Sequence, residues 1–476
     1  MNSAESTPPP ADASPPSNRS ALVIVFLVVF IDLLGFGIIL PLLPRIADGY
    51  VRRLLPDATW QIGLVVGLLM SSFSLMQFFF APIWGRLSDR IGRRPILLLG
   101  LFGSVAFYAL FGYAAALSPS DSAMTALVLF FLARIGAGVA GATISTAQAV
   151  IADSTPPEKR KQGMALIGAA FGICFTFGPL IGFGCLWISD GYLPLIGYTA
   201  AGLSAVALIL GVALLPETRV AGGDSTARRH VLDITAIIAA LADPRISPVI
   251  LTFFIASLGF GAFEVTLALF LKDTFGFGEN DSFLVFAFIG VVLMITQGFI
   301  YRRLAARVSE PTWMMLGIVF MAIGVVMLGA INWSAASAFQ HDALPVIGAG
   351  TICLAGLDFW PALAAPGILA QRDLGAWHQP GMYIALVASV VGFAFLTPSA
   401  QALISRRTSA DRQGEILGVN QAASAMARIL GPIFGVTLYK ATDTHLLPYI
   451  AGAVLLLLML PMLPKIRRGD DSPLAA

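Results

Sequence analysis

The chain has 476 residues, of which 57% are hydrophobic and only 12% are charged. Soluble domains carry about 25% charged residues, so this composition indicates a membrane protein. The formal net charge of +2 is too small to predict nucleic-acid binding. Cys174, Cys185 and Cys353 stand in apolar segments without the spacing of zinc ligands, so we expect no metal site and no cofactor.

The chain begins with a tail, residues 1–19, whose Pro- and Ser-rich composition predicts disorder. Apolar runs then recur along the sequence, each near the ~20 residues that cross a bilayer as a helix. They predict an all-α integral membrane protein. Twelve spans are expected, at residues 20–43, 61–84, 95–117, 124–152, 163–187, 192–214, 247–272, 280–301, 312–332, 380–404, 414–437 and 446–464.

The basic residues predict the orientation of these spans. In the twelve-span topology, most of the 29 Lys and Arg residues fall on one side of the membrane. Cytoplasmic flanks of membrane helices are enriched in positive charge. We therefore expect both termini in the cytoplasm and the chain in a plasma membrane, the inner membrane of a bacterium. Counting residues 333–379 as a span would move Arg406, Arg407 and Arg412 to the outside, against this pattern, so that segment is predicted to be an extracytoplasmic insertion.

The first span contains a single acidic residue. Asp32 lies in a run from Ala21 to Leu43 that otherwise holds only apolar residues, Gly and Pro. A charge at the bilayer centre costs at least ~2.5 kcal/mol, so an intramembrane acid points to function. We expect Asp32 to face a wet cavity and to exchange a proton. A polar tie to a backbone or hydroxyl neighbour is the structural alternative.

The sequence repeats itself at about half its length. The segment FIDLLGFG, from Phe30, returns as FIASLGFG, from Phe254, with Ala256 in place of Asp32. AQAVI and GPLIG in the first half likewise return, in the same order, as AQALI and GPIFG. Such duplication is typical of transporters. It predicts two six-helix bundles, residues 20–214 and 247–464, joined by the polar linker 215–246 and followed by a cytoplasmic tail, 465–476.

The loop between the second and third spans reads GRLSDRIGRRP. By charge alone it is a positive cytoplasmic loop. With the two-bundle repeat, its order of Gly, Asp and Arg resembles the signature loop of the major facilitator superfamily. The resemblance implies twelve helices in two pseudo-symmetric bundles and a latch between them in the outward-facing state, with Asp89 near Gly414 at the start of span eleven and Arg93 paired with Asp153. The implied latch residues are Gly85, Asp89, Arg90, Gly92, Arg93, Arg94 and Asp153.

Span four carries a polar stripe at helical spacing. Arg134, Gly138, Gly141, Ser145 and Gln148 share one face, which fits a helix that lines a wet cavity. The alternative is a close-packing face from which Arg134 extends to the membrane interface. The segment resembles the arginine-containing fourth span of drug:proton antiporters, and the residues after it resemble those of tetracycline efflux pumps.

Span five contains the segment GICFTFGPLIGFG. Pro179 bends a helix, while Gly178 and Gly182 allow a neighbouring helix to approach closely. The Gly-Pro-x-x-Gly core resembles a motif of antiporters in this superfamily. The match is partial, because Cys174 and Phe183 replace two of that motif's glycines, so a simple proline kink remains the alternative.

Two further charges fall inside predicted spans, Glu264 in span seven and Arg428 in span eleven. In the superfamily, spans one, four, seven and ten surround the central cavity. The resemblance therefore implies that Asp32, Arg134 and Glu264 come together, with Ser257 on the cavity face of span seven. Arg428 is expected to be structural.

These features predict a monomeric, proton-coupled transporter that exports a small amphipathic, tetracycline-like compound. The alternative is a proton symporter that imports a sugar or an organic acid. Tetracycline itself is in doubt, because span nine lacks the acid that some tetracycline pumps carry there. The histidines are scattered in loops, which argues against an enzyme, and no phosphate-binding loop for ATP occurs.

Overall fold

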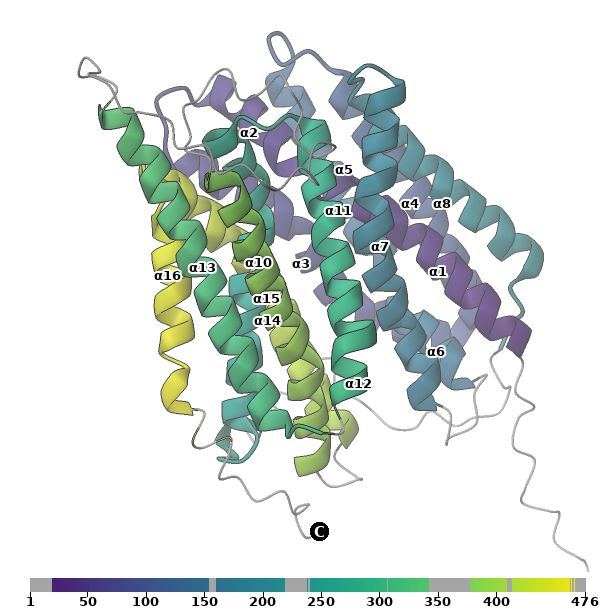
Figure 1. Ribbon diagram of the computed structural model, residues 1–476. Helices are drawn as coiled ribbons and strands as arrows, with labels where there is room; N and C mark the ends of the chain where they lie inside the picture. The colour runs from purple at the N-terminus through teal and green to yellow at the C-terminus, as the bar shows by residue number, and fades with distance from the viewer. Residues whose placement is uncertain are drawn as a thin grey trace, which may run out of the picture.

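The computed structural model describes residues 19–153, 160–218, 238, 240–305, 307–341, 377–408, 413–462, 464 and 466. Within this part of the chain, all regular structure is helical (Figure 1). Most of the predicted linker, most of the insertion and nearly all of both tails lie outside the described residues. The predictions for those segments, and the exact bundle boundaries, therefore stay predictions.

The helices follow the predicted spans closely. The first half holds α1 (Arg19–Ile39), α2 (Leu43–Leu54), α3 (Trp60–Ile91), α4 (Arg93–Ala116), α5 (Ala123–Gly141), α6 (Ile144–Asp153), α7 (Arg160–Ile188) and α8 (Pro194–Leu214). The second half holds α10 (Ser247–Phe275), α11 (Glu279–Ile295), the π-helix η2 (Thr296–Tyr301), α12 (Arg302–Leu304), α13 (Glu310–His341), α14 (His378–Arg407), α15 (Gln413–Lys440), α16 (Leu447–Leu457) and the 3-10 turn η3 (Leu460–Met462).

Four predicted spans differ from the helices. Span two continues to Ile91 in α3, so most of the GRLSDRIGRRP segment is helical, and span four is interrupted at residues 142–143, between α5 and α6. The first span is not one straight helix: α1 and α2 form a pair bent by 42°. Pro41 lies in the break and lacks the backbone N–H that would continue the ladder. In addition, α13 continues to His341 instead of ending at residue 332, because the intervening residues include neither Gly nor Pro.

Nine of the described helices are long and apolar enough to cross a membrane, or ten when the bent pair counts as one span. Two shorter apolar helices, Gly172–Ile188 and Leu447–Met462, lie where spans five and twelve are expected. The chain is thus a multi-pass membrane protein, and the count of twelve spans stays a prediction.

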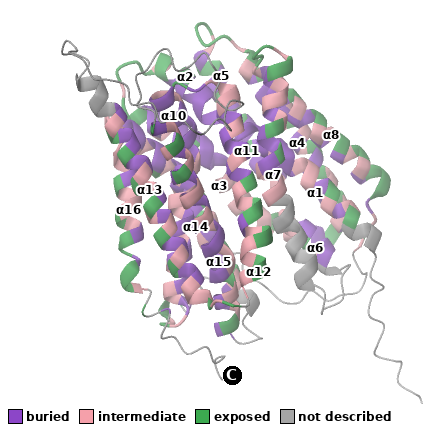
Figure 2. Ribbon diagram, in the orientation of Figure 1, coloured by how far each residue is buried: buried purple, intermediate pink, exposed green. Residues whose placement is uncertain are grey.

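The helices pack in two groups. In the first half α1 packs on α7 and α8, and α4 packs on α5 and α8. In the second half α13 packs on α14, and α10 packs on α15 and α14. The groups meet where α3 contacts α15 and where α7 contacts α11 (Figure 1). Buried residues concentrate between the helices, and exposed residues lie on the outer faces and the helix ends (Figure 2).

The sequence repeat reappears in the packing. A Cβ atom added to Gly178 on α7 would lie 2.7 Å from the backbone of Gly37 on α1. One added to Gly431 on α15 would lie 2.9 to 3.1 Å from backbone atoms around Gly261 on α10. Gly37 and Gly261 end the two copies of the first repeated segment, and Gly178 and Gly431 begin the copies of another. Equivalent glycines therefore join equivalent helices in both halves.

We expect Gly178→Val to destabilise the protein, because overpacking a close contact typically costs about 1–3 kcal/mol and the neighbour here is backbone. The apparent melting temperature of the detergent-purified protein measures the effect. Gly184 lies further along the same helix, and a Cβ atom added there would meet no atom within 4 Å, so Gly184→Val is the matched control. Equal melting temperatures for the two variants would contradict the role assigned to the glycine contact.

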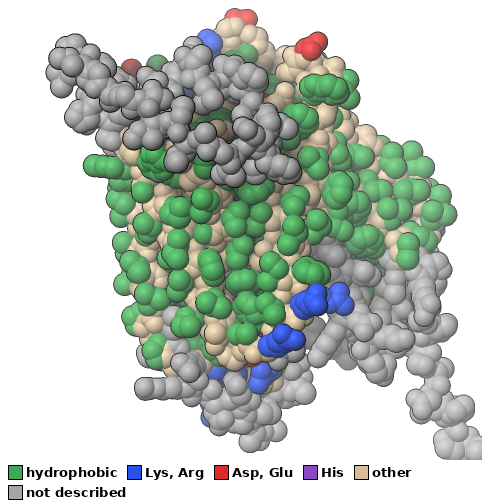
Figure 3. All heavy atoms as spheres, in the orientation of Figure 1, with side chains coloured by type: hydrophobic (Ala, Val, Ile, Leu, Met, Phe, Trp, Pro, Cys, Tyr) green, Lys and Arg blue, Asp and Glu red, His purple; other side chains and the backbone are tan. Residues whose placement is uncertain are grey.

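On the face drawn in Figure 3, hydrophobic side chains cover the middle of the molecule, and the charged side chains of the described residues lie toward its two ends. We call the end where α1 and α15 begin the lower face, and the end that carries α2 and the turns at 276–278 and 441–446 the upper face, as oriented in Figure 1. Exposed tryptophans mark the upper boundary of the apolar middle, as is typical of a membrane interface. They are Trp60, Trp187, Trp333 and Trp377.

Candidate functional site

The carboxylate of Asp32 is held by hydroxyl groups. Ser204 on α8 donates a hydrogen bond to Asp32 Oδ1 at 3.0 Å, and the Ser104 hydroxyl on α4 is a second partner. Both serines are fully buried. Tyr108, one helical turn beyond Ser104, is buried and lies close to the same carboxylate. Asp32 thus points into its own helix group, toward α4 and α8, where hydroxyl groups stabilise it.

A small cavity lies beside Asp32. Its volume is about 30 Å³, which is room for about two water molecules, since one needs roughly 10–15 Å³. Polar side chains that can hold water contribute to its walls, and water there would offset part of the cost of burying the acid. The lining residues are Val28, Val29, Asp32, Leu33, Phe36, Phe73, Gln77, Leu97, Leu101, Tyr108, Gly141, Thr143 and Ile144.

Arg134 on α5 is 3% exposed and packs against aromatic rings. Its guanidinium carbon lies 4.5 Å from the centre of the Phe73 ring and 5.8 Å from that of Phe36. Its Nε has no hydrogen-bond partner, and in the described part of the chain no carboxylate forms an ion pair with it. Tyr108 neighbours both Arg134 and Asp32. The two charges therefore flank one tyrosine without pairing.

Glu264 lies on α10, in the second half of the chain. The charge that acts on it is that of Arg428 on α15, next to the contact between Gly261 and Gly431. Glu264 Oε1 is buried and has no hydrogen-bond partner. In the described residues no ion pair joins Glu264 to Asp32 or Arg134, but Cys174 on α7 neighbours both Tyr108 and Glu264. The single cluster of Asp32, Arg134 and Glu264 that the superfamily arrangement implied therefore stays a prediction. Arg428, expected to be structural, faces an acid proposed for coupling.

The predicted cavity stripe of span four lies mostly against α3. Gly138 approaches the backbone of Phe73, and Ser145 Oγ donates a hydrogen bond to the Ala81 carbonyl at 3.0 Å. This is the close-packing alternative for those two residues. Gln148 is exposed and Ser257 is buried, and a cavity-lining role for either stays a prediction.

The signature loop is anchored to the end of α8. Gly92 adopts a positive φ of 112°, which favours glycine. The Glu217 carboxylate accepts hydrogen bonds from the backbone N–H groups of Arg93 at 2.9 Å and Arg94 at 3.2 Å. These groups open α4, where an acid is favoured by the helix dipole. Glu217 thus belongs to this loop, although nothing in the loop's own sequence points to it.

The other latch residues lie in the same region. Arg93 forms an ion pair with Asp89 and a hydrogen bond with Ser88 Oγ at 2.8 Å. Gly85 lies opposite Ser145 on α6. The side chain of Asp153 lies outside the described residues, so the predicted latch across the bundles, including the roles of Arg90 and Arg94, stays a prediction.

The span-five motif contacts two helices. Gly178 packs on α1, as described above, and Gly182 receives the ring of Phe283 from α11 in the other half. Two turns below, Gly290 on α11 approaches the backbone of Phe175 and Thr176 on α7. Pro179 lies inside α7, which continues past it to Ile188. The motif therefore forms part of the contact between halves, while its link to antiport stays a prediction.

Comparison with known proteins identifies the family. The family model described as Major Facilitator Superfamily matches residues 25–365 and 345–475. The tetracycline resistance protein, class C, of Escherichia coli is 28% identical over 454 residues, covering 95% of this chain and 98% of the relative. Major facilitator superfamily domain-containing protein 10 of Mus musculus is 28% identical over 489 residues, covering 94% and 93%.

Solved structures agree on the fold. The human organic anion transporter MFSD10 aligns with a TM-score of 0.61 and 24% identity, over 94% of this chain and all of that one. A D-xylose-proton symporter aligns with a TM-score of 0.67 and 14% identity over 94% and 99%. The helical architecture, the repeated glycine contacts and the family match together show that the chain belongs to the major facilitator superfamily of membrane transporters, which are not enzymes.

Proposed function

We propose that this protein is a proton-coupled antiporter that exports a small amphipathic compound carrying an acidic group. The observation that carries the proposal is the environment of Asp32. Its carboxylate is hydrogen-bonded by a hydroxyl group and lies beside a small cavity, and no cation of the described residues forms an ion pair with it. A carboxylate without a fixed counter-charge can gain and lose a proton, which a salt-bridged one resists. Glu264, facing Arg428, is the second candidate acid.

The substrate class is inferred from Arg134 and from the relatives. An unpaired guanidinium beside the stacked rings of Phe36 and Phe73 offers charge and stacking to an acidic, ring-containing molecule. Tetracycline resistance proteins and a transporter named for organic anions are among the similar proteins. Both names fit an amphipathic compound with an ionisable group.

The direction of export rests on the partial antiporter motif and on orientation. We propose that the lower face is cytoplasmic, because more of the described basic residues lie there than at the upper face. The lower set comprises Arg86, Arg90, Arg93, Arg94, Arg245, Arg302, Arg303, Arg307, Arg406 and Arg407, and the upper set comprises Arg45, Arg52, Arg53, Lys272 and Lys440.

Proteoliposomes with the purified protein test the coupling. With an acidic interior, we expect vesicles to accumulate a transported compound while internal protons leave, because antiport couples opposite fluxes whichever way the protein is inserted. Tetracyclines and a panel of amphipathic acids are the probes, and a pH-sensitive dye inside reports the protons. Accumulation driven by an acidic exterior would instead establish the importing symporter, and transport that is indifferent to pH would reject both.

A further inference from the structure

The upper face is closed by side chains of α2 that reach into the second half. Arg45 is the first of these, with its side chain 6% exposed. Its Nη1 donates hydrogen bonds to the Gly278 carbonyl at 2.7 Å and to Ser282 Oγ at 2.5 Å. Its Nη2 donates to the Phe277 carbonyl at 2.8 Å. One guanidinium from the first half therefore binds three acceptors of the second half, two in the turn between α10 and α11 and one at the start of α11.

The shape of that turn explains why an arginine fits. Gly276 ends α10 in the left-handed conformation, with φ of 67°, and the carbonyls of the next two residues receive the guanidinium. Phe277 lies between the two helices and Gly278 is the N-cap of α11, and each backbone carbonyl has two lone pairs with which to accept hydrogen bonds. A planar guanidinium can donate to several of them at once, whereas a lysine ammonium lacks that fork. Glu279 adds a carboxylate at 3.5 Å.

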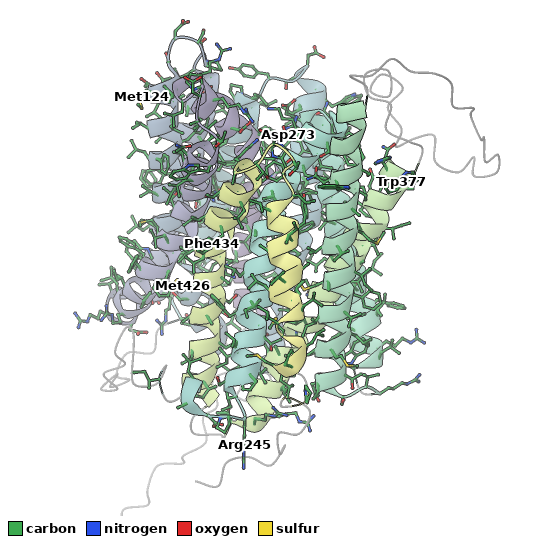
Figure 4. The ribbon with its side chains drawn as sticks, turned by 90° about the vertical axis from the view of Figure 1, so that its left-hand side faces the viewer. Met124, Arg245, Asp273, Trp377, Met426 and Phe434 are labelled. Carbon is green, nitrogen blue, oxygen red and sulfur yellow. The ribbon has the colours of Figure 1, made fainter. Side chains whose placement is uncertain are left out.

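The second contact is an ion pair that is almost fully buried. Asp48 on α2 has a side chain 1% exposed and lies 3.2 Å from Lys440 Nζ on α15, which is 3% exposed. Lys272 on α10 lies 3.9 Å from the same carboxylate. Lys440 is also held by Asp273 of its own half at 3.1 Å, at the upper end of the molecule (Figure 4).

The neighbouring His445 is not one of the cations that face Asp48. Burial lowers the pKa of His445, so its ring is neutral near pH 7. Its Nδ1 lies 2.7 Å from the Tyr439 carbonyl, and the ring stacks on Tyr439. The lysines are therefore the cations that face Asp48 from the second half.

Below these contacts the two halves touch backbone to backbone. Gly67 on α3 approaches the backbone of Pro432 and Ile433 on α15. Ser71 is buried one turn further down, and its hydroxyl donates a hydrogen bond to the Ile429 carbonyl at 2.5 Å. Ser71 therefore marks the lower end of the sealed region and can report when it opens.

We infer that Arg45 with its acceptors on Phe277, Gly278 and Ser282, and Asp48 with Lys440, form a lock that holds the upper face closed and releases it once per transport cycle. Each group loses hydration when the face closes and regains it when the face opens. The pairing gained on closure and the hydration gained on opening offset each other, as for buried ion pairs in general. Such a lock keeps the two states close in free energy, and ligands can then shift the balance. It does not depend on which ion drives transport.

A cysteine placed at the base of the seal tests this. In a chain whose native cysteines are replaced by serine, Ser71→Cys is labelled with a membrane-impermeant maleimide. We expect Asp48→Asn and Lys440→Met each to raise the labelling rate about tenfold, because each substitution removes the shortest ion pair between the halves, while Lys440 keeps Asp273 and Asp48 keeps Arg52 within their own halves. Arg45→Lys is expected to act in the same direction. The double variant of Asp48 and Lys440 should label no faster than the faster single variant, because both changes remove one contact.

Arg52→Gln is the matched control. Arg52 Nε donates a hydrogen bond to the same Asp48 carboxylate at 2.9 Å, but from within α2, so its loss removes a partner without breaking a contact between halves. It should label at the parent rate. Parent-rate labelling of all three lock variants would overturn the lock, and so would a control that labels as fast as Asp48→Asn. Labelling needs neither a proton gradient nor a substrate, so a failure here is distinct from a failure of the proposed function. If one of the three lock variants does not fold, the labelling rates of the other two still test the lock.

Discussion

Asp32→Asn is expected to reduce proton-driven transport to the level of protein-free vesicles, while downhill exchange of substrate continues. Asparagine has the same size and keeps an acceptor oxygen for the Ser104 and Ser204 hydroxyls, so the packing of α1 against α4 and α8 should survive. It has no exchangeable acid proton, which the proposed antiport requires. Transport driven by a pH gradient, compared with substrate counterflow at equal pH, separates the two activities.

Ser204→Ala is the control for this cluster. It removes a hydrogen bond worth about 1 kcal/mol but leaves the carboxylate in place, so gradient-driven transport should persist within a few-fold. Glu264→Gln, made in parallel, asks whether the second acid carries the proton. Full coupling in Asp32→Asn together with its loss in Glu264→Gln would move the proton site to the second half. Full coupling in both variants would show that neither Asp32 nor Glu264 carries the transported proton.

The helices were predictable because apolar length and the repeat are local properties of the sequence. Most spans matched the described helices to within a few residues. The exceptions are the breaks in spans one and four and the longer helices α3 and α13. Pro41 breaks the first span where a purely apolar count continues through it, and α13 extends because no Gly or Pro stops it. The resemblance of the GRLSDRIGRRP loop led to the family, and the family match confirms it.

The partners of the intramembrane charges were not predictable in the same way. Ser104 and Ser204 stand 72 and 172 residues from Asp32 along the chain, in mostly apolar helices whose sequences do not show which face meets α1. The contacts of the two lock residues of α2 could not be predicted for a different reason. Arg45 and Asp48 follow an apolar run and read as the polar end of a span, and only the bend of α2 over α10 turns them toward the other half. Contacts that depend on tertiary packing produce no periodic pattern in the sequence.

Arg134→Gln is expected to raise the KM for an acidic substrate at least about tenfold, the effect of losing roughly 1.4 kcal/mol of binding, with a smaller change in the maximal rate. The substitution removes a charge that the structure leaves unpaired, so it should not strand a carboxylate and the protein should remain folded. Arg134→Lys keeps the charge, but the lysine ammonium is more strongly hydrated and stacks less well on aromatic rings than a guanidinium. We therefore expect a KM between those of the parent and Arg134→Gln.

The readout that separates binding from structure is the choice of substrate. The two compounds compared are a transported acid and its neutral ester. Loss of Arg134 should raise the KM of the acid only, because the ester has no charge for the guanidinium to neutralise. A purely structural arginine, stabilising Phe36 and Phe73 through its position over their rings, predicts equal losses for both compounds and a lower melting temperature in Arg134→Gln. Equal losses at an unchanged melting temperature would reject both interpretations and place the anion site elsewhere, with Arg428 in the second half as the next cation to substitute.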